Sequence, residues 1–159
     1  MNKETKYDNL FMGYAKLTSA MSVSNRAKVG SILVKDHRIL CNSWNGTVAG
    51  DDNNCERQKT KKELSVPAHP LDLSPYTVTK PEVVHAEINL ISYCAKNGIN
   101  TNNATMYITL SPCVECAKAI IQCGIKEVVY KEPYRDPSGL EFLDSRGIKT
   151  RQFKGIEWH

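Results

Sequence analysis

Two short segments of the chain carry the residue types that bind metal ions and move protons. The first places His85 two residues before Glu87, and the second places Cys113 three residues before Cys116. Residues three apart lie on one face of a helix, and the positive N-terminal end of a helix lowers thiol pKa values, so two thiolates can bind one ion. His85 adds a third ligand and leaves the fourth tetrahedral position to water, as in catalytic zinc sites. We therefore predict one Zn2+ held by His85, Cys113 and Cys116, with Glu87 as the catalytic proton carrier.

Each half of this pattern has a simpler interpretation when it is taken alone. The cysteines can be buried thiols, His85 a satisfied core histidine and Glu87 a solvated helix residue. Residues two apart on a helix also point about 200° apart, so His85 and Glu87 can converge only around the first turn. The two halves together, in this order and each at a predicted helix start, favour a catalytic zinc site. A purely structural zinc is the remaining alternative.

The elements that position these residues can be predicted from hydrophobic periodicity and from turn residues. We expect a helix over about residues 7–21 whose apolar face belongs to the core and contains Tyr7, Leu10, Tyr14, Leu17 and Met21. The strands are expected at 29–34 and 39–44 as a hairpin, and then at 105–110, 125–130 and 148–153. Further helices are expected at 82–96, 112–123 and 136–146. Strands and helices that alternate after residue 105 predict parallel strands covered by helices.

The segment from about residue 47 to 81 shows no periodicity and contains four prolines and a basic patch. That patch consists of Arg57, Lys59, Lys61 and Lys62. Such a long irregular stretch inside a compact domain is usually a functional or mobile insertion. We therefore predict a single domain over residues 1–159 with an irregular insertion at about 47–81.

Composition narrows the class of protein further. A chain of 159 residues with 41% apolar and 24% charged residues fits one folded domain, and a net charge of +4 suits an anionic substrate without indicating a nucleic-acid partner. No apolar run is long enough to cross a membrane and the N-terminus lacks a signal-peptide pattern, so we expect a cytoplasmic protein without a membrane partner. Outside the predicted zinc site, Cys41, Cys55, Cys94 and Cys123 lack a comparable spacing and are predicted to be ordinary buried or idle thiols. A second metal at Cys55 and His69 is an alternative.

The order H-x-E followed by P-C-x-x-C is the signature of zinc-dependent nucleobase deaminases. With the flanking stretches 84–89 and 105–130, the sequence resembles the deoxycytidylate (dCMP) deaminase family of the cytidine deaminase superfamily, including its phage-type members. This resemblance implies a three-layer α/β/α fold with a mixed five-stranded sheet. It also implies a homo-oligomer, most often a hexamer.

The resemblance also assigns roles to residues in the loops around the substrate. It implies that Asn45 hydrogen-bonds the sugar, that the Ala86 backbone and Ser111 face the pyrimidine, and that Tyr134 closes over the nucleotide. Tyr134 and Trp44 are alternatively simple packing residues.

Arg26 and Lys28 are the candidates for binding the phosphate, and a solvated turn is an equally good interpretation of both. The family usually has Gly-Tyr-Asn-Gly after its second strand, associated with control by dCTP and dTTP. Here the run is Ser43-Trp44-Asn45-Gly46, which makes Trp44 and Gly46 allosteric candidates while putting the usual control in doubt. A bound triphosphate effector would bring Mg2+ with it.

The predicted reaction is the hydrolysis of dCMP to dUMP and ammonia, which supplies thymidylate synthesis. Glu87 would take a proton from water, protonate N3 of cytosine during attack at C4, and then deliver a proton to the departing amine. Three alternatives stay open: the same reaction on dCTP as well, a deaminase of RNA or single-stranded nucleic acid, and a noncatalytic zinc-stabilised nucleotide-binding module.

Overall fold

A five-stranded sheet forms the centre of the protein in the computed structural model, which describes residues 2–68 and 75–155. Its strands are β1 (Gly30–Lys35), β2 (Arg38–Trp44), β5 (Thr105–Leu110), β6 (Glu127–Glu132) and β7 (Lys149–Gln152), in the order β2-β1-β5-β6-β7. Strand β1 is antiparallel to β2 and β5, whereas β5, β6 and β7 are parallel. The predicted mixed five-stranded sheet is therefore confirmed.

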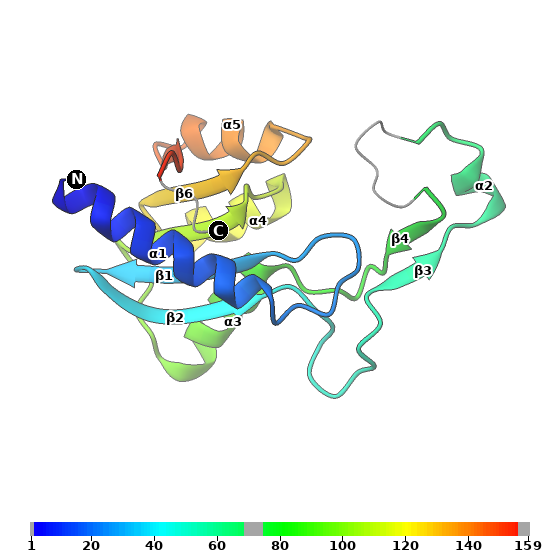
Figure 1. The fold of residues 1–159 in the computed structure, drawn as a ribbon, viewed down its shortest axis with the longest axis horizontal. Helices are drawn as coiled ribbons and strands as arrows, with labels where there is room; N and C mark the ends of the chain where they lie inside the picture. Colours follow the sequence, from blue (N-terminus) through cyan, green and yellow to red (C-terminus); the bar gives the residue numbers. More distant parts are fainter. Residues whose placement is uncertain (1, 69–74, 156–159) are drawn as a thin grey trace.

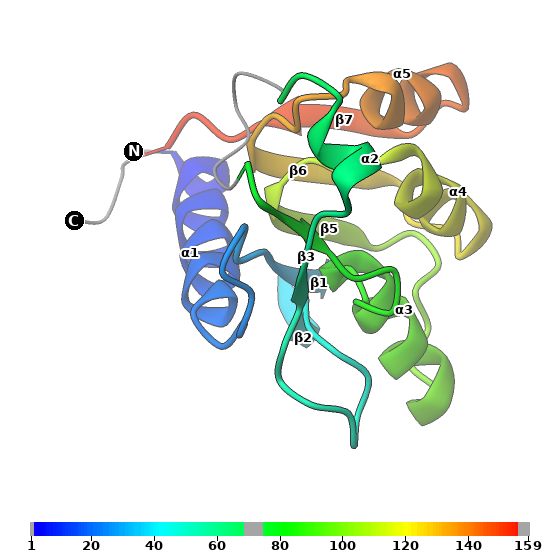
Figure 2. The ribbon, with the colours of Figure 1, turned by 90° about the vertical axis from the view of Figure 1, so that its right-hand side faces the viewer.

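Helices cover both faces of this sheet (Figures 1 and 2). They are α1 (Lys3–Ser19) on one face and α3 (Ala86–Asn97), α4 (Val114–Gln122) and α5 (Ser138–Ser145) on the other. Successive side chains of a strand point to opposite faces, so Ile32 packs with Phe11 of α1 while its neighbour Leu33 packs with Leu90 of α3. The three-layer α/β/α arrangement follows. No helix in the described part of the chain is long and apolar enough to span a bilayer.

The predicted apolar face of the first helix is wrong. Helix α1 instead buries Phe11, Met12 and Ala15. Of the residues expected in the core, Tyr7 is partly buried and packs against this cluster, whereas the other four are exposed. The exposed fractions are 48% for Leu10, 48% for Tyr14, 73% for Leu17 and 60% for Met21. The reason is a close approach between α1 and β1, because a side chain at Gly30 would lie 2.9 Å from the Cα atom of Ser19. The small side chain of Ala15 permits this contact, and the helix is rotated by about one residue relative to the prediction.

The other predicted elements are present with shifted ends. The hairpin of β1 and β2 turns at Asp36 and His37, both with positive φ. Helix α3 ends at Gly98, whose φ is 66°, as the sequence predicts. It begins at Ala86, four residues later than predicted, and α4 and α5 each begin two residues late. These delays place His85 and Cys113 directly before helices rather than inside them.

The insertion is more ordered than predicted. It contains the short antiparallel strands β3 (Glu56–Gln58) and β4 (Thr77–Thr79), and the one-turn helix α2 (Lys61–Leu64), which extend beside the main sheet (Figure 1). Strands of three residues are too short to show periodicity, which explains why the sequence did not reveal them. His69, proposed as a metal ligand with Cys55, lies outside the described residues. The single domain over residues 1–159 stays a prediction.

The four cysteines outside the predicted zinc site are free thiols. Cys41 and Cys94 are buried with their sulfur atoms 3.2 Å apart, Cys55 is buried, and Cys123 is partly buried. Burial, together with Cys94, raises the pKa of the Cys41 thiol to about 12. These thiols are therefore protonated and serve as packing groups, as predicted.

A network of an ion pair and hydrogen bonds connects α1 to the sheet and makes the free energy of unfolding depend on pH. Arg151 donates two hydrogen bonds of 2.7 and 2.8 Å to Asp8, and the Tyr107 hydroxyl donates a third of 2.6 Å. Burial alone would raise the pKa of Asp8, but these donors hold it below its ordinary value. Asp8 therefore stabilises the fold fully above its unfolded-state pKa of about 4, and this contribution is lost as the pH falls through its folded-state pKa.

We expect Asp8→Asn to lower the free energy of unfolding by about 2 kcal/mol at pH 7. The difference from wild type should stay level from pH 7 to about pH 5 and shrink below about pH 4, as measured by urea unfolding. Glu4→Gln, an exposed change in the same helix, should cost less than about 0.5 kcal/mol. A difference that stays constant with pH would contradict this assignment.

Candidate active site

Two helix N-termini bring the predicted metal ligands together. His85 is the N-cap of α3 and Cys113 is the N-cap of α4, both with extended backbone, while Cys116 lies one turn into α4. The Nδ1 atom of His85 lies 3.4 Å from Sγ of Cys116 and 3.7 Å from Sγ of Cys113. Ligand atoms at about 2.1 to 2.3 Å from a tetrahedral zinc lie about 3.6 Å apart. The donor types and their spacing therefore fit Zn2+.

The pKa values of the two thiols are shifted in opposite directions by their mutual contact. Hydrogen bonds from Cys116 and His85 lower the pKa of Cys113 to about 3, because they stabilise the thiolate. The pKa of Cys116 is raised, because its thiol donates to Cys113 and because it is buried. Metal binding would displace this remaining proton. Among the residues that the structure describes, these three ligands form one candidate metal group, and no second group has this geometry.

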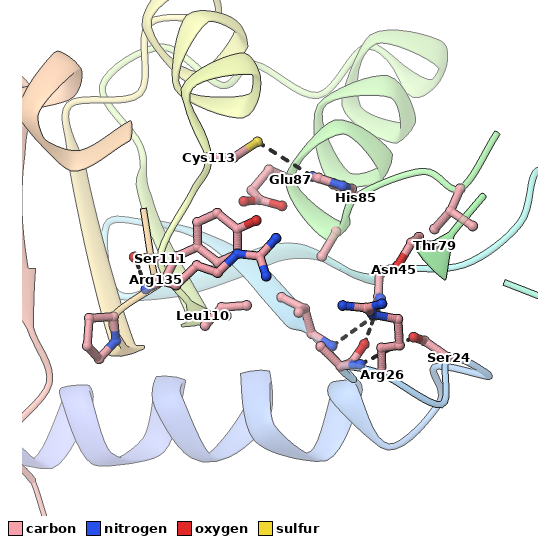
Figure 3. Close-up of a pocket in the computed structure, with 16 residues that line it drawn as sticks. Ser24, Arg26, Asn45, Thr79, His85, Glu87, Leu110, Ser111, Cys113 and Arg135 are labelled. Atoms are coloured by element: carbon pink, nitrogen blue, oxygen red, sulfur yellow. Dashed lines mark hydrogen bonds between the residues drawn. The ribbon is translucent and has the colours of Figure 1, made fainter. Parts of the chain in front are cut away.

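Glu87 lies beside this group with its carboxyl group buried. Only 4% of the residue is exposed, and burial raises its pKa to about 7. Two residues two positions apart inside a helix would point in different directions, but His85 precedes the helix. Its backbone is extended (φ −68°, ψ 152°), and Glu87 lies in the first helical turn. Both side chains therefore reach the same pocket (Figure 3). A carboxyl group with a pKa near neutrality can both accept and donate a proton.

Buried serines of the hairpin fix the start of α3. The hydroxyl groups of Ser31 in β1 and Ser43 in β2 both donate hydrogen bonds to the Ala86 carbonyl oxygen. Gly46 and Val84 pair through two backbone hydrogen bonds just before the helix. The sequence interpretation missed these two serines, because a small hydroxyl residue in a strand gives no signal of its own.

A pocket of about 370 Å³ opens beside the metal group, within the size range of small-ligand sites. Of the predicted substrate-binding residues, Arg26, Asn45, Ala86, Ser111 and Tyr134 line it. The other predicted residues do not line it: Lys28 is exposed, and Trp44 and Gly46 are partly buried outside the pocket.

Two of these lining residues also hold the loops around the pocket. The Asn45 side chain accepts a hydrogen bond of 2.8 Å from the Val29 backbone and donates one of 2.8 Å to the Ala27 carbonyl oxygen. Ser111 accepts a hydrogen bond of 2.7 Å from the Tyr134 backbone N–H. The amide of Asn45 has a second N–H, so these contacts leave it able to donate to a ligand.

The sequence interpretation also missed pocket residues from two other segments. Arg135 lines the pocket with its guanidinium group 5.8 Å from the centre of the Tyr134 ring. Thr79 reaches the pocket from β4 of the insertion. A signal for Arg135 was present, since it directly follows Tyr134 in a loop already expected to surround the substrate. No sequence pattern pointed to Thr79.

Gly139 at the start of α5 supports the Cys113 segment. A side chain there would place its Cβ atom 2.8 Å from the carbonyl carbon of Cys113 and closer still to the Pro112 carbonyl oxygen. We therefore expect Gly139→Ala to shift Cys113 and weaken zinc binding by about tenfold, similar to the loss of an outer-shell contact. Competition with a chromophoric chelator measures this change. Glu141→Ala, an exposed change in the same helix, should leave zinc affinity unaltered.

Comparison with known proteins gives a consistent result. Residues 5–132 match the cytidine and deoxycytidylate deaminase zinc-binding region. Deoxycytidylate deaminase of Enterobacteria phage T4 is 34% identical, over 86% of this chain and 84% of that protein. ComE operon protein 2 of Bacillus subtilis is 32% identical, over 92% of this chain and 70% of that protein.

The fold agrees with a solved structure from the same group. The crystal structure of dCMP deaminase from the cyanophage S-TIM5, in complex with dCMP and dUMP, superposes with a TM-score of 0.78 at 32% identity. The match covers 96% of this chain and 99% of that chain. From its zinc-binding motifs, its sheet and these relatives, the chain belongs to the cytidine and deoxycytidylate deaminase family.

Proposed function

We propose that this protein is a zinc-dependent dCMP deaminase that hydrolyses dCMP to dUMP and ammonia. The observation that carries the proposal is the buried Glu87 carboxyl group beside the His85, Cys113 and Cys116 group, in one pocket. Relatives named deoxycytidylate deaminase, and the cyanophage enzyme in complex with dCMP and dUMP, support the choice of substrate.

His85, Cys113 and Cys116 would hold the zinc, with the two helix N-termini stabilising the thiolates. When bound, zinc supplies a water molecule acidic enough to act as a nucleophile near neutral pH. Glu87 takes the proton of that water and passes it to N3 of cytosine, which makes C4 more electrophilic. After the resulting hydroxide adds to C4, Glu87 takes the proton of the new C4 hydroxyl group and donates it to the amino group. The C4–N bond then breaks, so that ammonia leaves and C4 keeps its oxygen as a carbonyl group. Its pKa near 7 suits both transfers.

The remaining pocket residues orient the nucleotide. We assign the base to the side formed by Ala86 and Ser111, and the sugar to the free N–H of Asn45. Tyr134 would cover the nucleotide. For the phosphate we assign Arg26 and add Arg135, because both line the pocket, whereas Lys28 does not. In Figure 3, Arg26 lies at the end of the pocket away from His85 and Cys113.

We expect Arg135→Ala to raise KM for dCMP about tenfold, because it removes one charged hydrogen-bond donor from the phosphate. The effect on kcat should be small, since the phosphate lies away from the reacting atoms. Steady-state kinetics with dCMP measure both constants, and the control is Arg146→Ala, an exposed arginine at the C-terminal end of α5 outside the pocket. An unchanged KM would remove Arg135 from the binding site.

Several finer features stay predictions. They are the homo-hexamer, control by dCTP or dTTP with Mg2+ through Trp44 and Gly46, and a cytoplasmic location. The exposed stripe on α1 supports association between chains, because Leu10, Tyr14 and Leu17 lie on one helix face away from the core.

The experiment is to measure ammonia release by zinc-loaded protein with deoxycytidine, dCMP, dCTP and a single-stranded RNA in parallel. Our proposal predicts turnover mainly of dCMP. Comparable turnover of dCTP would extend the substrate class to triphosphates. Turnover of RNA alone would contradict the proposal and identify the protein as an RNA deaminase. Zinc retention without ammonia release from any substrate would indicate a noncatalytic binding module.

A further inference from the structure

The loop from Ser24 to Val29 forms the wall of the pocket away from the metal ligands. Ser24, Arg26, Ala27 and Val29 all line the pocket. Asn45 holds the second half of this loop through Ala27 and Val29. The first half, which carries Arg26, needs a different support.

That support comes from Glu56 in β3 of the insertion, which lies 30 to 32 residues from these loop residues in sequence. Its Oε1 atom accepts hydrogen bonds from the Ser24 hydroxyl group at 2.8 Å and from the Asn25 and Arg26 backbone N–H groups at 2.9 and 3.3 Å. Its Oε2 atom accepts from the Asn25 side-chain amide at 3.2 Å. One carboxylate therefore binds three consecutive residues of the loop.

Glu56 is well suited to this task because it is buried and ionised. Only 8% of the residue is exposed. Burial by itself would raise its pKa, but the hydrogen bonds from Ser24, Asn25 and Arg26 lower it overall. Hydrogen bonds to a buried charged group are stronger than those to a neutral one, so this loop is held firmly.

Strand β4, which pairs with β3, also contacts the pocket and the loop that carries Arg26. Thr79 pairs with Glu56 in the small sheet and also lines the pocket. The Arg26 guanidinium group donates a hydrogen bond to the carbonyl oxygen of Thr77, two residues before it. Both strands of the insertion therefore contact the segment that carries Arg26.

We propose that Glu56 is a positioning residue for the phosphate end of the pocket, through which the insertion selects phosphorylated nucleotides over nucleosides. Glu56 acts through the loop and does not touch the substrate. This inference rests on the proposed deaminase function, because it uses the assignment of Arg26 to the phosphate.

The first test compares dCMP with deoxycytidine as substrates of Glu56→Gln. The amide keeps the size of the side chain but replaces one accepting oxygen with a donor and removes the charge. We expect KM for dCMP to rise about tenfold with kcat changed less than about twofold. The preference for dCMP over deoxycytidine, taken as the ratio of kcat/KM values, should fall by the same factor. Glu63→Gln, a change of an insertion carboxylate that pairs with Arg57 instead, should leave the ratio unaltered.

A second variant guards against a folding defect in Glu56→Gln. Asn25→Ala removes one donor to Glu56, and Asn25 itself does not line the pocket. We expect it to raise KM for dCMP about threefold in the same direction. Zinc content and circular dichroism of both variants should match wild type.

A double-mutant cycle with Arg26→Ala tests whether Glu56 acts through the loop. If it does, the double variant should raise KM little more than Arg26→Ala alone, because the residue that Glu56 positions is already missing. Multiplicative effects would overturn the inference, as would equal losses on dCMP and deoxycytidine, or a lower KM caused by removing a negative charge near the phosphate.

These outcomes are separate from a failure of the proposed function. If wild-type protein turns over dCMP but Glu56→Gln keeps its KM, only the inference about Glu56 fails. If zinc-loaded wild type neither turns over dCMP nor binds dUMP by calorimetry, the proposed function fails and the inference with it.

Discussion

Glu87→Gln should lower kcat for dCMP by about 10³-fold while the protein keeps one zinc per chain. Glutamine has the shape of the protonated Glu87 side chain, so the buried site around this 4%-exposed residue should hold its structure. It cannot take the proton of water or return one to the amine. Single-substrate kinetics of ammonia release, with zinc measured by atomic absorption, report the two properties separately.

The matched control is Glu115→Gln, which changes an exposed glutamate between the two cysteine ligands. Glu115 pairs with Lys118 at the surface and does not line the pocket, so we expect kcat to stay within about twofold of wild type. Zinc-replete Glu87→Gln protein with near-normal turnover would show that another group moves the protons.

Cys116→Ala should abolish activity by removing the metal. Cys116 is 1% exposed, and its sulfur atom lies 3.4 Å from Nδ1 of His85, so no nearby water can easily take its place as a ligand. We expect zinc affinity to fall by more than about 100-fold, above the loss that removing an outer-shell partner causes. Competition with a chromophoric chelator gives this affinity directly.

Cys123→Ala is the control for the loss of a thiol. Cys123 is partly buried at the end of α4 and donates to the Ile120 carbonyl oxygen, far along the helix from Cys116. The zinc affinity and the activity of Cys123→Ala should match those of wild type. A Cys116→Ala protein that binds zinc as tightly as wild type would remove Cys116 from the ligand set.

The candidate metal group could be predicted from the sequence because its residues lie at short spacings. Cys113 and Cys116 are one helical turn apart, and a helix start fixes their relation whatever the rest of the fold does. His85 and Glu87 show the limit of this reasoning. Helical geometry allowed them to converge only around the first turn, and the extended N-cap conformation of His85 is how the structure achieves this.

Features that depend on contacts between distant segments could not be predicted from the sequence. The burial of α1 is decided by the close approach of Gly30 to Ser19, so the apparent apolar stripe with Leu17 faced outward. The hydrogen bond from Ser24 to Glu56 joins residues 32 apart, and Glu56 belongs to the segment without periodicity. Such contacts require the folded chain, because neither residue type nor spacing signals them.

The most direct test of the account is to react the zinc-loaded protein with dCMP in water enriched in ¹⁸O. Hydrolytic deamination predicts dUMP that carries one ¹⁸O atom at C4, with one ammonia released per dUMP, as read by mass spectrometry and an ammonia assay. Unlabelled dUMP, or no dUMP at all from protein that retains its zinc, would contradict the central claim.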